Sequence, residues 1–236
     1  MAEETKQSVR IQTSLLNPYE KVALKWLAER MPRFVTSDQL TGIGLLGAVF
    51  IALGYFLCVF SPAWLWLSSF GYVVNWFGDS LDGTLARVRQ HQRPIYGFYI
   101  DHNLDCVCEF LMVGGAGLLP WVNAWSALMI VIPYLMMEVY VMINAHLKGV
   151  FNLTYSKLGP TELRVILILV NTCMFLFPMT REAVWQGKMP LYDKPMTLYF
   201  MDFGCLTIAA IIGIIYICSI VKDARSYAKM DPLKKD

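Results

Sequence analysis

Charged residues are scarce in this chain. Asp, Glu, Lys and Arg make up 16% of its 236 residues and hydrophobic residues 56%, whereas a typical soluble domain is about 25% charged. This shortage excludes an ordinary soluble domain and indicates that lipid is the solvent. Polar stretches rich in Gly and Ser, which would act as linkers, are also absent. We therefore expect a single domain, because one domain commonly takes about 100 to 200 residues.

Cysteine patterns typical of zinc sites and an N-terminal secretory signal are also lacking. No Cys-x-x-Cys pair recurs at ligand spacing. Most cysteines lie within apolar runs, which predicts buried thiols: Cys58, Cys106, Cys108, Cys173, Cys205 and Cys218. The first 17 residues contain no apolar core of signal-peptide length. We expect the first transmembrane helix to anchor the chain, and we expect no nucleic-acid partner.

Long apolar stretches are what the chain has instead. A helix needs about 20 apolar residues to cross a bilayer, and six such stretches follow one another, near residues 41–60, 62–82, 97–118, 122–146, 161–179 and 197–221. The sequence predicts an all-α, polytopic membrane protein with six transmembrane helices. We expect a cytosolic N-terminal segment over residues 1–37, a six-helix domain over 38–222 and a cytosolic tail over 223–236.

Basic residues are distributed unevenly around these stretches. Of the 20 Lys and Arg residues, 17 fall before the first stretch, in the second-to-third and fourth-to-fifth connections, or after the sixth stretch. Basic residues accumulate on the cytosolic side of membrane proteins. We therefore expect both termini and these two connections to be cytosolic, in a multi-pass protein of the bacterial inner membrane or the endoplasmic reticulum.

An amphipathic pattern precedes the first span, over residues 18–31. Its apolar residues share one helical stripe: Tyr19, Val22, Ala23, Trp26 and Leu27. The pattern predicts an interfacial helix lying on the membrane surface. A helix packed on another part of the protein is the alternative.

Four aspartates lie at the cytosolic ends of the second and third predicted spans. Asp79 and Asp82 are three residues apart, and Asp101 and Asp105 are four apart, so each pair shares a helical face. Because the connection is short, the two faces can meet, and converging carboxylates repel one another. A hard divalent cation such as Mg²⁺ or Mn²⁺ would neutralise this repulsion, since it prefers oxygen ligands. Solvated carboxylates at helix ends are the alternative.

Small residues and one arginine accompany the aspartates. Gly83 and Gly97 have no side chain, so a phosphorylated ligand can approach the backbone there. The guanidinium group of Arg87 is suited to bind a phosphate. A role for Arg87 as a cytosolic anchor is the alternative.

These residues together form a pattern that closely resembles the signature of the CDP-alcohol phosphotransferases of membrane phospholipid synthesis. The matching positions are Asp79, Asp82, Gly83, Ala86, Arg87, Gly97, Asp101 and Asp105. One departure is that nine residues, Val88 to Tyr96, separate the arginine from the second glycine, where eight are usual. The extra residue falls in the connection, which leaves the helical spacings intact.

The resemblance implies a metal-dependent transferase that splits a CDP-alcohol, releases CMP and joins the remaining phosphoryl group to an acceptor alcohol. It implies a homodimer of six-helix protomers in the bilayer, each with a polar cavity open to the cytosol and, we expect, two Mg²⁺ or Mn²⁺ ions. Asp79, Asp82 and Asp101 match metal ligands, and Asp105 matches a ligand or a base. Gly83, Ala86 and Arg87 match positions that hold the CDP group, and we add Gly97 as a substrate-binding position.

Two local features favour the choline/ethanolamine branch of this family. His102 follows Asp101, and Glu162 follows Thr161 at the start of the fifth span, as in enzymes that transfer a phospho-aminoalcohol to diacylglycerol. The resemblance implies that Glu162 takes the proton of the acceptor hydroxyl while His102 orients or relays it. A solvated His102 and a Glu162 that complements the helix dipole are the alternatives.

Two other functions remain open. The first is transfer of phosphatidyl from CDP-diacylglycerol to a polar alcohol such as inositol, inositol phosphate, glycerol phosphate or serine, in which Lys148, Lys157 and Arg164 would bind an anionic acceptor. The second, more remote, is an ion-coupled transporter that uses the aspartates as a relay. The position of the aspartates at one membrane face disfavours a relay, because relay carboxylates are expected deeper in the spans.

Overall fold

The computed structural model describes residues 9–11, 14–148, 150–152, 159–188 and 195–232. Its α-helices are α1 (Asn17–Arg30), α2 (Ser37–Leu57), α3 (Leu65–Val88), α4 (Pro94–Val113), α5 (Ala124–Lys148), α6 (Pro160–Leu176) and α7 (Phe200–Met230). The 3₁₀ turns are η1 (Pro62–Trp64), η2 (Gly114–Leu118) and η3 (Pro178–Arg181). The chain is therefore mainly helical, as predicted.

Four short strands were not predicted. Strands β1 (Val9–Ile11) and β2 (Val150–Asn152) pair in parallel, and β3 (Ala183–Lys188) and β4 (Pro195–Tyr199) pair antiparallel. The second pair lies between α6 and α7. Strands β1 and β2 have only three residues each, which is too short for the hydrophobic alternation from which strands are predicted.

Helices α2 to α7 coincide with the six predicted apolar stretches. Within the described residues, three helices are long and apolar enough to cross a membrane: Ser37–Leu57, Ala124–Leu147 and Phe200–Met230. Helix α6 has only 17 residues, and the aspartates interrupt the apolar character of α3 and α4. Six spans therefore stay a prediction, while three apolar helices support an integral membrane protein.

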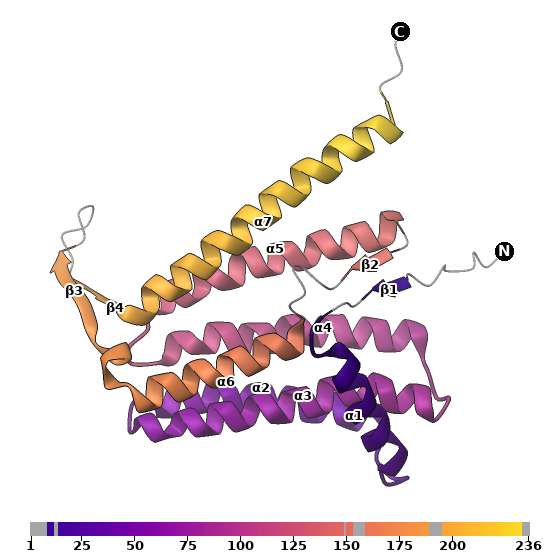
Figure 1. Cartoon of the computed structure of the whole chain (residues 1–236), viewed down its shortest axis with the longest axis horizontal. Helices are drawn as coiled ribbons and strands as arrows, with labels where there is room; N and C mark the ends of the chain where they lie inside the picture. Colours follow the sequence, from indigo (N-terminus) through magenta and orange to yellow (C-terminus); the bar gives the residue numbers. More distant parts are fainter. Residues whose placement is uncertain (1–8, 12–13, 149, 153–158, 189–194, 233–236) are drawn as a thin grey trace.

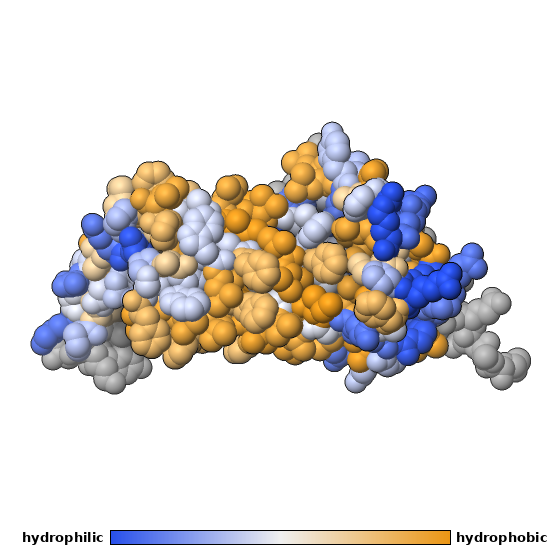
Figure 2. Space-filling view, turned by 90° about the horizontal axis from the view of Figure 1, so that it is seen from below, coloured by the Kyte–Doolittle hydropathy of each residue, from blue (hydrophilic) through white to orange (hydrophobic). Residues whose placement is uncertain are grey.

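Helices α2, α3, α4 and α6 run along the long axis of the molecule, α7 runs obliquely to it, and α1 crosses it (Figure 1). Helices α2, α3, α4 and α6 form one layer, and α5 and α7 form a pair beside it. The start of α1, the α3–α4 connection and the end of α7 lie at the same end, and β3 and β4 lie at the other. This arrangement agrees with the predicted grouping of basic segments. Figure 2 shows apolar side chains across the middle of one face and hydrophilic ones towards both ends.

Helix α1 packs on α3 through a face that differs from the predicted apolar stripe. Leu24 and Ala28 are buried in a cluster with residues of α2 and α3. Tyr19, Val22 and Trp26 remain 77%, 72% and 54% exposed. One face of the helix, with Leu27 of the stripe, therefore packs on the protein, while contact of the exposed stripe residues with a membrane surface stays a prediction.

Glycines allow α2 and α3 to pack closely, as small residues do in membrane helix pairs. A Cβ atom on Gly47 would overlap the backbone nitrogen of Asn75, and one on Gly78 would overlap the backbone of Gly44. A Cβ on Gly42, in the same helix as Gly47, would meet nothing within 4 Å. Close packing of these helices places the start of α2 directly beside the aspartates of α3.

The Gly47→Ala variant is therefore expected to unfold at a temperature several degrees below that of the wild type, because backbone atoms of α3 must move to admit the methyl group. The expected cost is about 1–3 kcal/mol, as for other overpacked sites. Thermal unfolding of purified protein in detergent measures it, with Gly42→Ala as the matched control. Equal melting temperatures for the two variants would contradict the close approach.

A buried carboxylate joins α7 to the start of α5. Asp202, fully buried, accepts hydrogen bonds from the backbone nitrogen of Asn123 at 2.8 Å, the side-chain amide of Asn123 at 2.6 Å and the backbone nitrogen of Tyr199 at 2.9 Å. The hydroxyl group of Ser126 also donates to it. These donors satisfy the buried charge and fix the end of the molecule opposite the aspartates of α3 and α4.

Candidate active site

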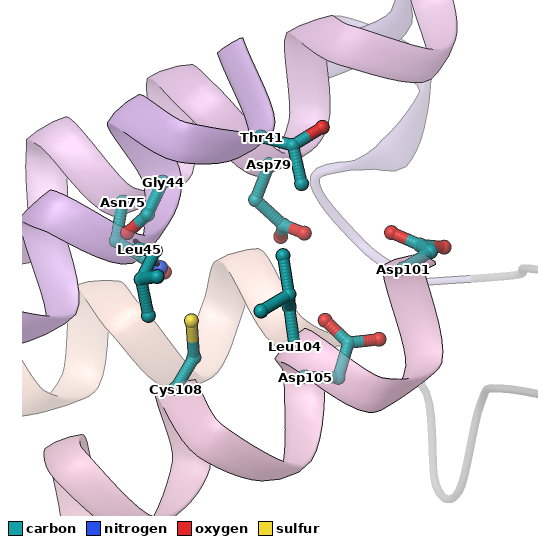
Figure 3. Close-up of a pocket in the computed structure, with 9 residues that line it drawn as sticks. All are labelled: Thr41, Gly44, Leu45, Asn75, Asp79, Asp101, Leu104, Asp105 and Cys108. Atoms are coloured by element: carbon teal, nitrogen blue, oxygen red, sulfur yellow. Dashed lines mark hydrogen bonds between the residues drawn. The ribbon is translucent and has the colours of Figure 1, made fainter. Parts of the chain in front are cut away.

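Three carboxylates from two helices converge at one end of the molecule. Asp79 lies on α3, and Asp101 and Asp105 lie one turn apart on α4. One carboxylate oxygen of each lies within 4.8 Å of the others, and Figure 3 shows the side chains around a common space between the two helices. We call Asp79, Asp101 and Asp105 the carboxylate triad. Its oxygens and spacing fit a hard divalent cation.

The fourth predicted ligand, Asp82, is held apart from the carboxylate triad. One oxygen of its buried carboxylate accepts a hydrogen bond from the hydroxyl group of Thr41 at 2.6 Å, and the other accepts from the backbone nitrogen of Gly83. The hydroxyl of Ser37 donates to the backbone oxygen of Asp82 at 2.8 Å. Helix α2 therefore supplies polar partners to the second aspartate, and the structure brings together three of the four predicted carboxylates.

Arg164 of α6 contacts the carboxylate triad through Asp79. Its guanidinium group donates a hydrogen bond to Asp79 in a partly buried ion pair, and its Nε donates to Asn75 Oδ1 at 2.8 Å. The side-chain amide of Asn75 donates to the backbone oxygen of Gly44 at 2.9 Å. Helices α2, α3 and α6 are thus joined through one polar chain beside the triad. Asn75 was not predicted as a site residue, although a polar residue within an apolar run is a recognisable signal.

The predicted nucleotide-binding residues lie on the last turns of α3 and the first turn of α4. Arg87 is exposed, and its Nη2 donates to the hydroxyl of Thr84 at 2.9 Å. A Cβ on Gly83 would lie 3.4 Å from Arg87 Nη1, whereas one on Gly97 would meet nothing within 4 Å. Ala86 is half-buried next to Arg87. The structure therefore places these residues at the same end as the carboxylate triad, with open backbone at Gly97.

The profile of the CDP-alcohol phosphatidyltransferase family matches residues 34–215, which include α2 to α6, the carboxylate triad and half of α7. The chain belongs to this family. Members of the family are metal-dependent transferases of phosphate-containing groups, and the carboxylate triad could hold a metal ion. Family membership confirms the resemblance seen in the aspartate and glycine pattern.

Two curated relatives carry different names. A phosphatidylinositol phosphate synthase from Cutibacterium acnes is 40% identical over 72 residues, which cover 30% of this chain and 32% of that protein. Cholinephosphotransferase 1 from Danio rerio is 23% identical over 184 residues, which cover 75% of this chain and 47% of that protein. The chain thus spans less than half of the length of either relative. Membership in the CDP-alcohol phosphatidyltransferase family fixes the class of reaction but not the alcohol.

His102, one of the residues that favoured the choline/ethanolamine branch, lies beside the carboxylate triad. Its Nδ1 lies 2.9 Å from the backbone oxygen of Phe98 and 4.0 Å from Asp101 Oδ2, and its ring stacks on Phe98 at 4.1 Å. Because a carbonyl oxygen only accepts, Nδ1 carries a proton, and the lone pair of the neutral ring is on Nε2. The imidazole is therefore oriented next to a triad member.

Glu162 has a different environment from the one that the resemblance implies. Its buried carboxylate accepts a hydrogen bond from the backbone nitrogen of Leu16 at 2.7 Å and from that of Gly159 at 2.9 Å. It thus caps the start of α6 by accepting from the backbone nitrogen of the N-cap residue Gly159, and it ties α6 to the segment before α1. The structure brings Arg164 of the same helix to the triad, while Glu162 faces α1.

The other two candidates for an anionic acceptor are not placed at the site. Lys157 lies outside the described residues, and Lys148 is the last residue of α5. Arg164, the third candidate, pairs with Asp79.

The acidic row on α4 continues beyond the carboxylate triad. Glu109 lies one turn after Asp105, and Glu138 of α5 accepts a hydrogen bond from the thiol of Cys106 at 3.3 Å. The four-residue spacing from Asp101 through Asp105 to Glu109 is visible in the sequence, so Glu109 could have been included in the predicted acidic face.

Proposed function

We propose that this chain transfers a phospho-aminoalcohol, phosphocholine or phosphoethanolamine, from its CDP ester to the hydroxyl group of a diacylglycerol-type lipid. The convergence of Asp79, Asp101 and Asp105 at the family motif is the observation that carries the phosphotransfer. The contact between Arg164 and Asp79 supports an uncharged acceptor, because this guanidinium group is already paired with a carboxylate. The presence of His102 beside Asp101 supports the same branch.

The carboxylate triad would hold Mg²⁺ or Mn²⁺. When bound, such an ion neutralises phosphate charge and polarises the phosphoryl group. For a second ion, Asp82 would exchange its bond from Thr41 for a metal bond. Gly83, Ala86, Arg87 and Gly97 would hold the CDP group, with Arg87 donating to its phosphates.

The transfer is a direct displacement at the phosphorus atom bonded to the aminoalcohol. A bond forms between the acceptor oxygen and this phosphorus, the bond from the phosphorus to CMP breaks, and CMP leaves with the bonding electrons. The acceptor hydroxyl loses its proton to a base during this step. We assign the base to Glu162 together with His102, and Asp105 is the alternative. As a base, Glu162 would have to release its backbone donors.

A second candidate is transfer of phosphatidyl from CDP-diacylglycerol to a polar alcohol. It is supported by the 40% identity to a phosphatidylinositol phosphate synthase, although over only 72 residues. An ion-coupled transporter fits less well, since family membership indicates a transferase.

Assays of the purified chain separate these functions. With Mg²⁺ or Mn²⁺ present, we expect CMP release from CDP-choline or CDP-ethanolamine that depends on added diacylglycerol. CDP-diacylglycerol with inositol, inositol phosphate, glycerol phosphate or serine is the comparison. If CMP were released only from CDP-diacylglycerol, phosphatidyl transfer would become the preferred function.

The proposed assembly is a homodimer in the bilayer, with both termini and the carboxylate triad facing the cytosol. A cysteine placed at the C-terminal Asp236 should then react with a membrane-impermeant maleimide only after the cells are opened. Labelling in intact cells would show that the C-terminus is outside and that the predicted orientation is wrong.

A further inference from the structure

A recess separate from the carboxylate triad lies between α1, α3 and α6. Its volume is about 240 Å³, and it is lined by Leu16, Tyr19, Glu20, Ala23, Trp76 and Thr161. A water molecule occupies about 30 Å³ of liquid volume, so the recess has room for a group of several heavy atoms. None of these residues belongs to the aspartate and glycine signature, and Thr161 belongs only to the Thr-Glu pair at the start of α6.

The polar group of the recess is the carboxylate of Glu20. Its Oε1 accepts hydrogen bonds from Trp76 Nε1 at 2.8 Å and from the hydroxyl of Thr161 at 2.7 Å. Within the described part of the chain, the ion pairs involve other carboxylates, and no Lys, Arg or His pairs with Glu20. Two neutral donors therefore hold the carboxylate, and among the described residues no basic side chain pairs with it.

Two aromatic side chains, Tyr19 and Trp76, line the same space as this carboxylate. An anionic group beside aromatic rings attracts an organic cation, because the faces of the rings carry negative charge and the apolar walls suit methyl groups. Quaternary ammonium groups are recognised in this way. A metal ion suits the recess less, since a single carboxylate offers few of the oxygen ligands that hard cations require.

We propose that this recess binds an alkylammonium group of the choline or ethanolamine type. Glu20 supplies the opposite charge, Tyr19 and Trp76 supply aromatic side chains, and Ala23 and Leu16 supply apolar walls. The ammonium group has two sources: the aminoalcohol of the CDP ester and the headgroup of a bilayer lipid. The first source rests on the proposed function, whereas the second does not.

The recess shares two helices with the carboxylate triad. Trp76 directly follows Asn75, which binds Arg164, and Thr161 lies three residues before Arg164 on α6, about 4.5 Å along the helix axis. A ligand held by Glu20 and Thr161 would therefore stabilise the first turn of α6, which carries the arginine that contacts Asp79.

The CDP ester is tested as the source of the ammonium group by measuring the binding of CDP-choline and of CDP to the purified chain in a maltoside detergent. Glu20→Gln keeps an oxygen acceptor for Trp76 and Thr161 but removes the charge. We expect it to weaken CDP-choline binding about 10-fold or more while CDP binding stays unchanged. Glu29→Gln is the matched control, because Glu29 is exposed on the same helix and pairs with Lys25.

The headgroup of a bilayer lipid is tested as the source with the protein in nanodiscs that contain spin-labelled phosphatidylcholine or phosphatidylglycerol. If the headgroup is the source, Glu20→Gln leaves CDP-choline affinity unchanged and removes the preference for phosphatidylcholine. Tyr19→Leu should weaken several-fold the binding of CDP-choline or of phosphatidylcholine, whichever is the source, and Tyr19→Phe should not. This comparison provides a test even if Glu20→Gln fails to fold. Wild-type binding of all probes by Glu20→Gln and Tyr19→Leu would overturn the proposal. If CDP-diacylglycerol were the only CDP ester turned over, only the proposed substrate would be overturned, since the nanodisc experiment still tests binding in the recess.

Discussion

Asp101→Asn is expected to lower turnover by about 10³-fold or more. The amide keeps the size of the side chain but removes the charge that the carboxylate triad uses to bind a cation. A bound metal ion commonly contributes several kcal/mol to transition-state stabilisation, and each 1.36 kcal/mol corresponds to a factor of ten in rate. The measurement is CMP release at saturating Mg²⁺ or Mn²⁺. The same loss is expected for Asp79→Asn and Asp82→Asn.

Asp38→Asn is the matched control for this experiment. Asp38 is an exposed carboxylate in the first turn of α2, and it pairs with Arg93 rather than with the triad. The control should keep near wild-type turnover, and thermal unfolding of all variants should resemble that of the wild type. Turnover close to wild type in Asp101→Asn would contradict the assignment of a metal site.

Glu162→Gln is expected to slow turnover by about 10²- to 10⁴-fold, the usual contribution of a general base. Binding of the CDP ester should stay unchanged, because Glu162 bonds to Leu16 and Gly159, which are not among the residues assigned to the CDP group. Single-turnover rates as a function of pH, together with equilibrium binding of the CDP ester, measure the two effects separately. His102→Gln should reduce the same chemical step.

The capping role of Glu162 gives a competing outcome that the same measurements reveal. Gln offers one oxygen acceptor, so one of the backbone nitrogens of Leu16 and Gly159 would lose its partner. A purely structural role would lower the melting temperature and leave the pH profile of the chemical step unchanged. If Glu162→Gln kept full turnover and Asp105→Asn lost it without losing metal, the base would be Asp105, and phosphatidyl transfer would become the preferred function.

The helices could be predicted because their signal is local. Apolar runs of membrane-spanning length gave the approximate positions of α2 to α7, and the three- and four-residue spacings placed the aspartates on shared faces. The structure confirmed that Asp79, Asp101 and Asp105 converge. Local patterns also predicted α1, whose apolar stripe follows from its helical period.

Partners chosen between distant segments could not be predicted in the same way. Thr41 holds Asp82 and Arg164 holds Asp79 because α2 and α6 pack against α3, which no local spacing reveals. The face of α1 that packs on α3 was missed for the same reason: Leu24 and Ala28 are less conspicuous than the aromatic stripe. The role of Glu162 was predicted from a motif, whereas its bond to Leu16 joins residues 146 positions apart in the chain.

The ion pair between Arg164 and Asp79 makes the arginine a built-in counter-ion. One of the three triad carboxylates is already neutralised by the protein, so assembly of α3, α4 and α6 does not depend on a divalent cation to relieve repulsion. Chelation with EDTA should therefore abolish turnover but leave the protein folded, and added Mg²⁺ should restore activity without refolding. In Arg164→Leu the melting temperature should depend on Mg²⁺ concentration more strongly than in the wild type, because the cation would then also replace the positive charge of the arginine at Asp79.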